Sequence, residues 1–324
     1  MSLFYKLAFK AVFFFTSLSD KKIHKKNPAV EEVTHSTLRY LKDKKQEHLL
    51  NFIYEKDQKE KTPLVFNIHG GGWMYGDKDL NLDFGRFISK NHFSVGMPSY
   101  SLAFKGTLKQ MLDELFSALS YLIKHEKELN IDSDNIFLTG DSAGAHLALL
   151  MAAILNSEKL QEVYQIKPEK LNIRGLILCN PAPYIDKFKF VEKPAWMDKG
   201  ARKTFEQMMY GKNCKDKAEY KYASFSNFAE EARIFPPILI TTSTGDTYLG
   251  YQAEELDEDL TNRNIEHEYF CLEDSTVPHV FNILAPQDER SLKINNKIIS
   301  FINEHIATDK QDSQKEEATT SEAK

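Results

Sequence analysis

Short apolar runs alternate with longer amphipathic stretches along most of this chain. The apolar runs of strand length are residues 64–68, 135–139, 176–179, 237–242 and 265–272. Helical spacing is found between them, as in the Ala- and Leu-rich stretch 145–155. Strands that alternate with helices predict an α/β fold with a mainly parallel central sheet flanked by helices.

One region is too long to be an ordinary connection between two such elements. It runs from about residue 182 to residue 235 and carries aromatic and methionine residues among charges. We interpret it as a small helical lid inserted into the sheet domain. Its side chains are suited to gripping an apolar acyl or aryl group, although packing against the sheet domain is the preferred interpretation for any single one.

A glycine-flanked serine follows one of the predicted strands. Residues 140–144 read Gly-Asp-Ser-Ala-Gly, between the run 135–139 and the helical stretch 145–155. In such a G-x-S-x-G turn the chain leaves a strand and enters a helix sharply, so the serine is strained and its neighbours must be small. Ser142 is therefore the predicted nucleophile.

A run of glycines follows another predicted strand, 64–68. Residues 69–73 read His-Gly-Gly-Gly-Trp. Glycines let the backbone approach a ligand with free N–H groups, as an acyl-transfer enzyme needs to stabilise an oxyanion. A flexible turn or a weak phosphate loop is the alternative, but the chain has no G-x-x-x-x-G-K-[ST] pattern.

With these two motifs the chain resembles the hormone-sensitive-lipase-like esterases of the α/β-hydrolase fold. The form HGGGW-x-x-GDK over residues 69–78 is also similar to bacterial feruloyl or acetyl esterases and arylformamidases. The resemblance covers about residues 45 to 305 and implies a triad in the chain order Ser, Asp, His. It also implies that Gly71 and Gly72 supply oxyanion-hole N–H groups, and the nucleophile turn places another on Ala143.

The other two members of the triad are expected downstream of the serine. Asp246 lies in the loop after the run 237–242, where a doubly wound sheet places its catalytic groups, and it matches the family's Asp-x-x-Leu. Capping of the next helix is the alternative role for this aspartate. His279 follows the run 265–272 and is the predicted base, whereas His267 lies inside that run and is expected to pack or face solvent.

The remaining histidines and Trp73 have other expected places. His146, on the helix after the nucleophile, is expected to be a buttress beneath the site, and His69 to hold the glycine loop in shape. Trp73 is a candidate for substrate binding in the acyl pocket, with core packing as the alternative. Histidines in charged surroundings are expected to be solvated: His24, His35, His48, His92, His125 and His305.

These residues predict a serine hydrolase, a carboxylesterase that cleaves esters of small acyl groups through an acyl-enzyme. No metal or organic cofactor is needed. An arylformamidase-like amide hydrolase and a carbohydrate acetyl or feruloyl esterase remain alternatives. A non-catalytic α/β-hydrolase scaffold is disfavoured, because such proteins usually lose a triad member and this chain has a candidate for all three.

Composition agrees with this interpretation. The 324 residues, 42% of them hydrophobic, suffice for one large α/β domain with a lid. A net charge of −5 without a basic aromatic face predicts no nucleic-acid partner. The expected partner is a small-molecule ester substrate. A homodimer is left open. Three scattered cysteines argue against disulfides or a zinc site and favour the cytoplasm.

Both ends of the chain depart from the pattern. Apolar residues fall at helical spacing from Phe4 to Leu18, with Lys6 and Lys10 on the other side. This segment, 1–45, is expected to cap the site. The alternatives are a helix that lies on an anionic membrane surface, which implies a membrane-associated protein, and a poor signal peptide, which implies a secreted one. Residues 46–306 are expected to form the hydrolase domain, and the polar residues 307–324 a disordered tail.

One segment departs from the resembled group. That group commonly has a Tyr-Arg-Leu-Ala-Pro-like stretch after the third strand, and this chain reads Tyr-Ser-Leu-Ala-Phe at residues 100–104. The missing arginine removes a buttress whose replacement cannot be identified from the sequence.

Overall fold

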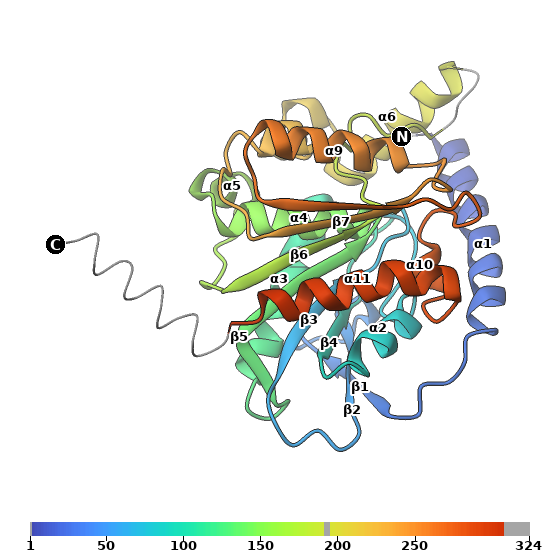
Figure 1. Cartoon of the computed structure of the whole chain (residues 1–324). Helices are drawn as coiled ribbons and strands as arrows, with labels where there is room; N and C mark the ends of the chain where they lie inside the picture. The colour runs from blue at the N-terminus through green and yellow to red at the C-terminus, as the bar shows by residue number, and fades with distance from the viewer. Residues whose placement is uncertain (1, 191–194, 308–324) are drawn as a thin grey trace.

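The centre of the molecule is an eight-stranded sheet with the spatial order β1-β2-β4-β3-β5-β6-β7-β8 (Figure 1). The computed structural model describes residues 2–190 and 195–307. The strands are β1 Val33–Arg39, β2 Leu49–Glu55, β3 Thr62–Ile68, β4 Ser94–Pro98, β5 Ile131–Asp141, β6 Ile173–Cys179, β7 Ile238–Ser243 and β8 His267–Leu272.

The sheet is parallel except at one side. β2 pairs antiparallel with both β1 and β4, and every pair from β4 across to β8 is parallel. The carboxyl ends of the parallel strands therefore lie at one edge of the sheet. Ser142, Asp246 and the glycine run each follow such an end, so the topology brings them to the same side of the molecule.

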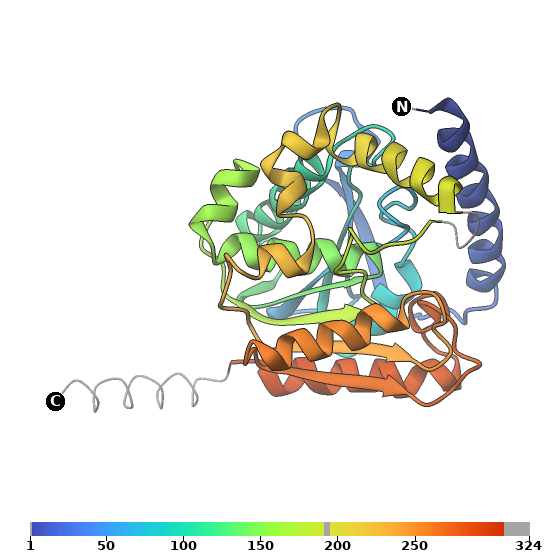
Figure 2. The ribbon, with the colours of Figure 1, turned by 90° about the horizontal axis from the view of Figure 1, so that it is seen from above.

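Helices cover both faces of the sheet (Figures 1 and 2). α2 (Leu82–Ser89), α10 (Phe281–Leu284) and α11 (Glu289–His305) lie on one face, and α3 (Leu108–Lys124), α4 (Ala143–Leu155), α5 (Glu158–Tyr164) and α9 (Gly250–Asn262) lie on the other. Alternate strand residues point to opposite faces. Val65 therefore packs into the core on the side of α2 and α11, and Phe66 into the core on the side of α3 and α4. Both side chains are almost fully buried, which explains why the strands read as continuous apolar runs.

The chain between β6 and β7 forms a separate group of short helices. They are α6 (Ala195–Tyr210), η2 (Cys214–Asp216), α7 (Ala218–Lys221) and α8 (Phe225–Phe228). Phe205, Phe225 and Phe228 are buried in the core shared with α4, whereas Trp196 near the start of α6 is 68% exposed. These aromatic side chains of the inserted region thus pack against the sheet domain, which is the interpretation preferred above for any single one of them.

The first helix, α1 (Leu3–His24), crosses the rim of the molecule beside the start of α6 (Figure 2). Phe9 is buried on its inner face, with its ring 5.4 Å from that of Phe190. No helix among the described residues is both long and apolar enough to cross a membrane. The remaining short element is η1 (Gln46–His48), before β2. Most of the expected tail, residues 308–324, lies outside the described residues.

Candidate active site

Ser142 stands at the sharp turn between β5 and α4. Its backbone has φ 50° and ψ −116°, a region that non-glycine residues rarely adopt. The turn is held by the Ser142 N–H, which donates to the carbonyl of Cys179 at 2.9 Å. A Cβ atom on Gly144 would lie 2.0 Å from the carbonyl oxygen of Ile68, so a glycine is needed where the helix passes β3. The strained serine predicted from the G-x-S-x-G pattern is therefore present.

His279 and Asp246 form a hydrogen-bonded pair. Nδ1 of His279 lies 2.9 Å from Oδ2 of Asp246, whose side chain is fully buried, whereas that of His279 is 20% exposed. The same Asp246 oxygen accepts from the Asn180 amide at 2.8 Å, and Oδ1 accepts from the N–H groups of Tyr248 and Leu249. Burial alone would raise the pKa of Asp246, but the bond to His279 and the other donors hold this pKa below its usual value.

The glycine loop turns tightly beside Ser142. Gly71 and Gly72 have φ 92° and 57°, which strain any L side chain, and a Cβ atom on Gly71 would lie 2.2 Å from the carbonyl oxygen of Tyr75. Both glycines line the cavity that also exposes Ser142. Ala143, the third expected donor, is buried in the first turn of α4 directly after Ser142.

Asp141 supports this loop from the nucleophile turn. Its Oδ1 accepts from the N–H of Gly70 at 3.0 Å and from the Asn81 amide at 2.6 Å. Burial raises the pKa of Asp141 to about 6 in spite of these bonds. Sequence reasoning missed both supports, because Asp141 occupies the unspecified position of G-x-S-x-G and Asn81 belongs to no motif.

His69 packs inside the loop, as expected of its ring. It stacks on Tyr100 with ring centroids 4.4 Å apart, and the Tyr100 hydroxyl donates to the His69 carbonyl at 2.7 Å. Nδ1 of His69 lies 3.0 Å from the carbonyl oxygen of Gly70. Burial lowers the pKa of His69 to about 4, so the ring is neutral and holds the loop without carrying a charge.

Trp73 lies in the core and is absent from the cavity wall. Its side chain is fully buried, its Nε1 donates to Nδ1 of His146, and its ring contacts Phe188 and Phe205. The structure therefore corrects the expectation that Trp73 binds substrate, in favour of the alternative of core packing. The positive φ of 61° at Trp73 turns the chain after the glycines, which directs the indole inward.

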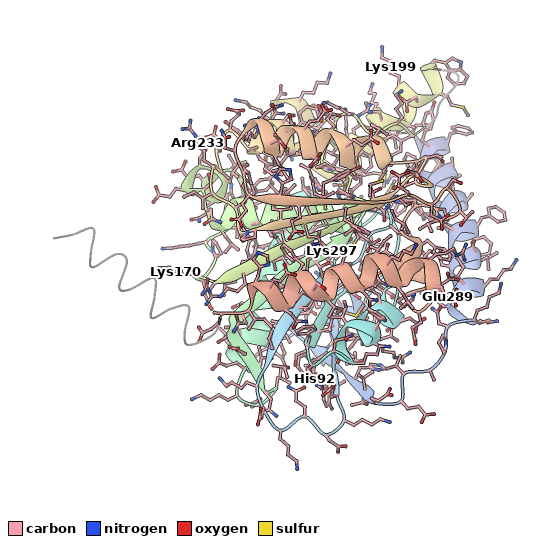
Figure 3. All side chains as sticks on the ribbon, in the orientation of Figure 1. His92, Lys170, Lys199, Arg233, Glu289 and Lys297 are labelled. Carbon is pink, nitrogen blue, oxygen red and sulfur yellow. The ribbon has the colours of Figure 1, made fainter. Side chains whose placement is uncertain are left out.

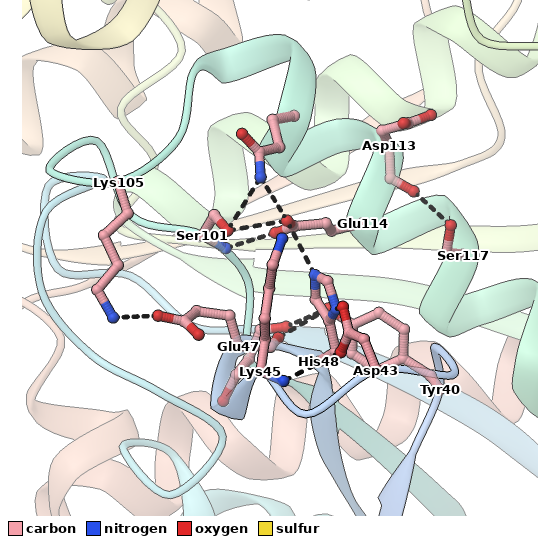
Figure 4. Close-up of polar contacts among 12 residues, drawn as sticks. Tyr40, Asp43, Lys45, Glu47, His48, Ser101, Lys105, Asp113, Glu114 and Ser117 are labelled. Carbon is pink, nitrogen blue, oxygen red and sulfur yellow. Dashed lines mark hydrogen bonds and ion pairs between the residues drawn. The ribbon is translucent and has the colours of Figure 1, made fainter.

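A buried polar cluster stands where the arginine of the resembled group is missing (Figure 4). Glu114 on α3 accepts from the N–H and the hydroxyl of Ser101, at 2.5 and 2.8 Å. The same carboxylate lies 3.1 Å from Nε2 of His48, whose Nδ1 lies 2.7 Å from Asp43. These contacts fix the chain next to Tyr100, at the position where the resembled group has its arginine.

The expectation that His48 is solvated is wrong, since only 3% of this residue is exposed. Its charged sequence neighbours are the reason for the error: Asp43 turns toward the ring, and Glu114 reaches it from a distant helix. By contrast, His92 has an 82% exposed side chain, as expected.

Ser142 and His279 open into one cavity of about 440 Å³. Gly71, Gly72 and Asp141 also line it. The rest of its wall is mainly apolar and comes from α1, the glycine loop, the start of the lid and the loops around α9 and α10: Phe9, Val12, Phe13, Met74, Leu80, Phe188, Phe190, Tyr248, Val280 and Leu284. An apolar chamber with a few converging polar groups suits a small uncharged molecule.

One carboxyl group in the cavity belongs to α1. Asp20 is buried, and the Tyr75 hydroxyl donates to its Oδ2 at 3.1 Å. Burial raises the pKa of Asp20, and the hydrogen bond from Tyr75 opposes this rise. Within residues 2–190 and 195–307, no three His, Cys, Asp or Glu side chains are arranged to hold a metal ion.

Comparison with known proteins adds a family to this geometry. A family model described as BD-FAE matches residues 50–260. An esterase of Gibberella moniliformis is 34% identical over 90 residues, 28% of each chain. Carboxylesterase 20 of Arabidopsis thaliana is 33% identical over 128 residues, which cover 38% of this chain and 37% of the relative. The matches thus span about a third of the length of these curated relatives.

Solved structures match over nearly the whole chain. Esterase B from Lactobacillus rhamnosis is 24% identical with a TM-score of 0.87, and 97% of this chain and 98% of that chain are covered. Bacterial heroin esterase is 19% identical with a TM-score of 0.66, and 91% and 90% are covered. At these identities the likeness establishes the α/β-hydrolase fold.

Proposed function

The chain belongs to the BD-FAE family, and from this premise we propose that it is a carboxylesterase acting on esters of small acyl groups. The observation that carries the proposal is the bond between His279 and the buried Asp246, in a cavity that also exposes the strained Ser142. The esterase names among its relatives support the same reaction class.

In the first step the Ser142 hydroxyl oxygen attacks the ester carbonyl carbon, and its proton passes to Nε2 of His279. Nε2 takes this role because Nδ1 is engaged with Asp246. The carbonyl π electrons move to the oxygen, and the N–H groups of Gly71, Gly72 and Ala143 stabilise the resulting oxyanion. When the carbonyl re-forms, the C–O bond to the alcohol breaks, and His279 returns the proton to the departing oxygen.

The second step repeats the sequence with water. His279 removes a proton from water, the resulting nucleophile attacks the acyl-enzyme, and Ser142 leaves as the protonated alcohol. Asp246 orients the imidazole and stabilises its charged form. Its lowered pKa keeps this carboxylate ionised at neutral pH, when the imidazolium forms.

The cavity wall supports apolar substituents of limited size on the substrate. Phe9, Phe13, Phe188 and Phe190 approach it from two sides, and the volume is about 440 Å³. Both the acyl group and the leaving group must fit within this space or extend from its mouth. Short acyl chains are therefore the proposed preference.

The test is hydrolysis of p-nitrophenyl esters from acetate to decanoate. Wild type is expected to turn over the short esters, and Ser142→Ala to lose at least about a thousandfold in kcat with an unchanged circular dichroism spectrum. Ser117→Ala on α3 is the matched control and should retain full activity, because its hydroxyl donates to the nearby carbonyl of Asp113 and Ser117 does not line the cavity. Retained ester hydrolysis in Ser142→Ala would contradict the mechanism.

Amide substrates test the alternative that the same three residues, Ser142, Asp246 and His279, hydrolyse a formamide. N-formylkynurenine should be a poor substrate beside phenyl acetate. Turnover of the formamide alone would replace the esterase proposal with an arylformamidase-like one. Feruloyl and acetylated carbohydrate esters extend the series to the remaining alternative.

A further inference from the structure

The outer face of α1 is apolar and exposed along most of its length. At 100° per residue, seven apolar residues fall within an arc of about 120°. We call them the outer stripe: Leu3, Phe4, Leu7, Ala11, Phe14, Phe15 and Leu18, all of them exposed. Leu3 is 70% exposed and Phe15 is 67% exposed. Contiguous apolar surface of this kind marks a site of interaction.

The opposite face of α1 is fixed to the catalytic cavity. Phe13 stacks on Tyr75 with ring centroids 5.7 Å apart, and Asp20 accepts from the hydroxyl of the same tyrosine. Near the end of the helix, His24 pairs with Asp83 at 3.0 Å. The helix is therefore held by its inner face at the rim of the molecule (Figures 1 and 2), and the exposed side chains of the outer stripe face solvent.

Positive charge continues the outer stripe. Lys21, Lys22 and Lys25 fall within the same arc, one to two turns beyond Leu18, and all three are exposed. The helix has a single acidic residue, Asp20, which is buried on the inner face. An amphipathic helix with aromatic residues on its apolar face and lysines beside them fits the headgroup region of an anionic lipid surface.

A second copy of the chain matches this face less well. A symmetric contact requires a surface that complements itself. Parallel pairing of two such helices would place lysines against lysines. Antiparallel pairing would place Lys21, Lys22 and Lys25 against the apolar start of the partner helix, with no acidic side chain on either stripe to balance them. Lipid phosphates supply the missing negative charge.

We propose that the outer stripe docks this protein on an anionic lipid surface, with α1 lying along that surface. Val12, which lies about 60° outside the arc of the stripe, is 59% exposed and also lines the cavity. Docking therefore brings the cavity wall to the lipid interface. On the proposed esterase function, this placement would favour apolar esters that partition into the lipid.

Binding of the full chain to vesicles tests the docking surface without any need for turnover. Wild type should sediment with vesicles of phosphatidylglycerol and phosphatidylcholine, and raising NaCl from about 0.1 to about 0.5 M should weaken binding. The variant Phe14→Gln/Phe15→Gln/Leu18→Gln should bind at least about tenfold more weakly. The variant Lys21→Gln/Lys22→Gln/Lys25→Gln should lose the preference for phosphatidylglycerol over pure phosphatidylcholine.

The matched control is Ile234→Gln, which removes another exposed apolar side chain, 72% exposed and next to Arg233. Figure 3 shows Arg233 on the side of the molecule away from α1. This control should bind vesicles as wild type does. All variants should hydrolyse a soluble p-nitrophenyl ester normally, since none of the changed residues lines the cavity.

Two results would overturn the proposal. One is wild-type vesicle binding that is absent or unaffected by the stripe variant. The other is a dimer in sedimentation velocity that dissociates in the stripe variant while vesicles remain unbound, which would assign the face to a second copy. Loss of esterase activity in every protein would refute the proposed function but leave the vesicle measurement intact.

Discussion

The indole N–H of Trp73 donates to Nδ1 of His146 at 3.2 Å, and Nε2 of the same imidazole donates to the carbonyl of Ala223 at 2.7 Å. One side chain thus joins the glycine loop, the helix after Ser142 and the inserted region. This pattern requires the neutral ring with its proton on Nε2. Burial lowers the pKa of His146 to about 4, so the ring stays neutral at physiological pH.

We predict that His146→Phe destabilises the protein and reduces its activity. The change leaves the buried Trp73 N–H and the Ala223 carbonyl without their partner, at a cost of about 1–3 kcal/mol each. Urea unfolding should show this loss, and kcat/KM for a short ester should fall because the glycine loop loses its anchor. His35→Phe, at an exposed position of β1, is the control. Equal unfolding midpoints for both variants would contradict the assigned role.

We predict that Asn180→Asp moves the acidic limb of the pH–activity profile upward. Asn180 donates to Asp246, and a carboxylate at this distance would repel the Asp246 charge and raise its pKa. Protonated Asp246 cannot stabilise the imidazolium, so kcat/KM should begin to fall at a pH about one unit higher than in wild type.

The control for this change is Asn213→Asp. Asn213 shares the positive φ of Asn180, 56° against 45°, but is exposed in the inserted region. Its substitution should leave the profile unchanged. If both variants keep the wild-type profile, Asp246 is not the group that supports His279.

We predict that Asp141→Asn stabilises the protein at neutral pH but not at acidic pH. The folded-state pKa is raised from 3.8 to about 6, so the folded protein holds this proton more tightly than the unfolded chain. The stability that the proton contributes is complete below about pH 4 and is lost as the pH rises through about 6. At pH 7 the ionised group therefore costs about 3 kcal/mol.

An asparagine at position 141 keeps an oxygen that accepts from the Gly70 N–H and the Asn81 amide, but it has no carboxyl group that titrates. Unfolding free energies measured from pH 4 to pH 7 should therefore show a difference between variant and wild type that grows with pH. Asp57→Asn, at an exposed position, should show no such growth. A difference that is independent of pH would mean that the pKa of Asp141 is not raised.

We predict opposite outcomes for two glycine-to-alanine changes in helices. Gly144→Ala places a methyl group 2.0 Å from the Ile68 carbonyl, so it should lower the free energy of unfolding by about 1–3 kcal/mol or more and disturb Ser142. Gly250→Ala meets its nearest atom at 3.8 Å and should be neutral or slightly stabilising. The melting temperature and the rate of ester hydrolysis should be measured for both variants. If Gly144→Ala is as stable and as active as Gly250→Ala, the close contact between position 144 and the Ile68 carbonyl is refuted.

Local sequence patterns were sufficient to predict most of the sheet. The runs 64–68 and 135–139 lie within β3 and β5, and the helical stretch 145–155 lies within α4, which begins two residues earlier. Periodicity and turn chemistry depend on neighbouring residues, so they are visible in one sequence. For the same reason the strained turn at Ser142 could be predicted from its flanking glycines.

Long-range partners could not be predicted in this way. Asn180 meets Asp246 from another strand end, and His48 meets Glu114 across the fold. Trp73 lay next to the expected oxyanion loop, but the side to which its indole turns depends on His146. The orientation of α1 also depends on tertiary packing, since its apolar residues occur on both faces and the spacing alone does not say which face is covered.

The two tryptophans of the chain occupy opposite environments, with Trp73 fully buried beside the glycine loop and Trp196 68% exposed on α6. Their fluorescence should therefore separate into a blue-shifted component shielded from acrylamide and a red-shifted component that acrylamide quenches. In a Trp196→Phe protein, the remaining emission comes from one indole that is hydrogen-bonded to His146. Such a protein would carry an intrinsic optical reporter of the glycine loop, readable during substrate binding without any attached dye.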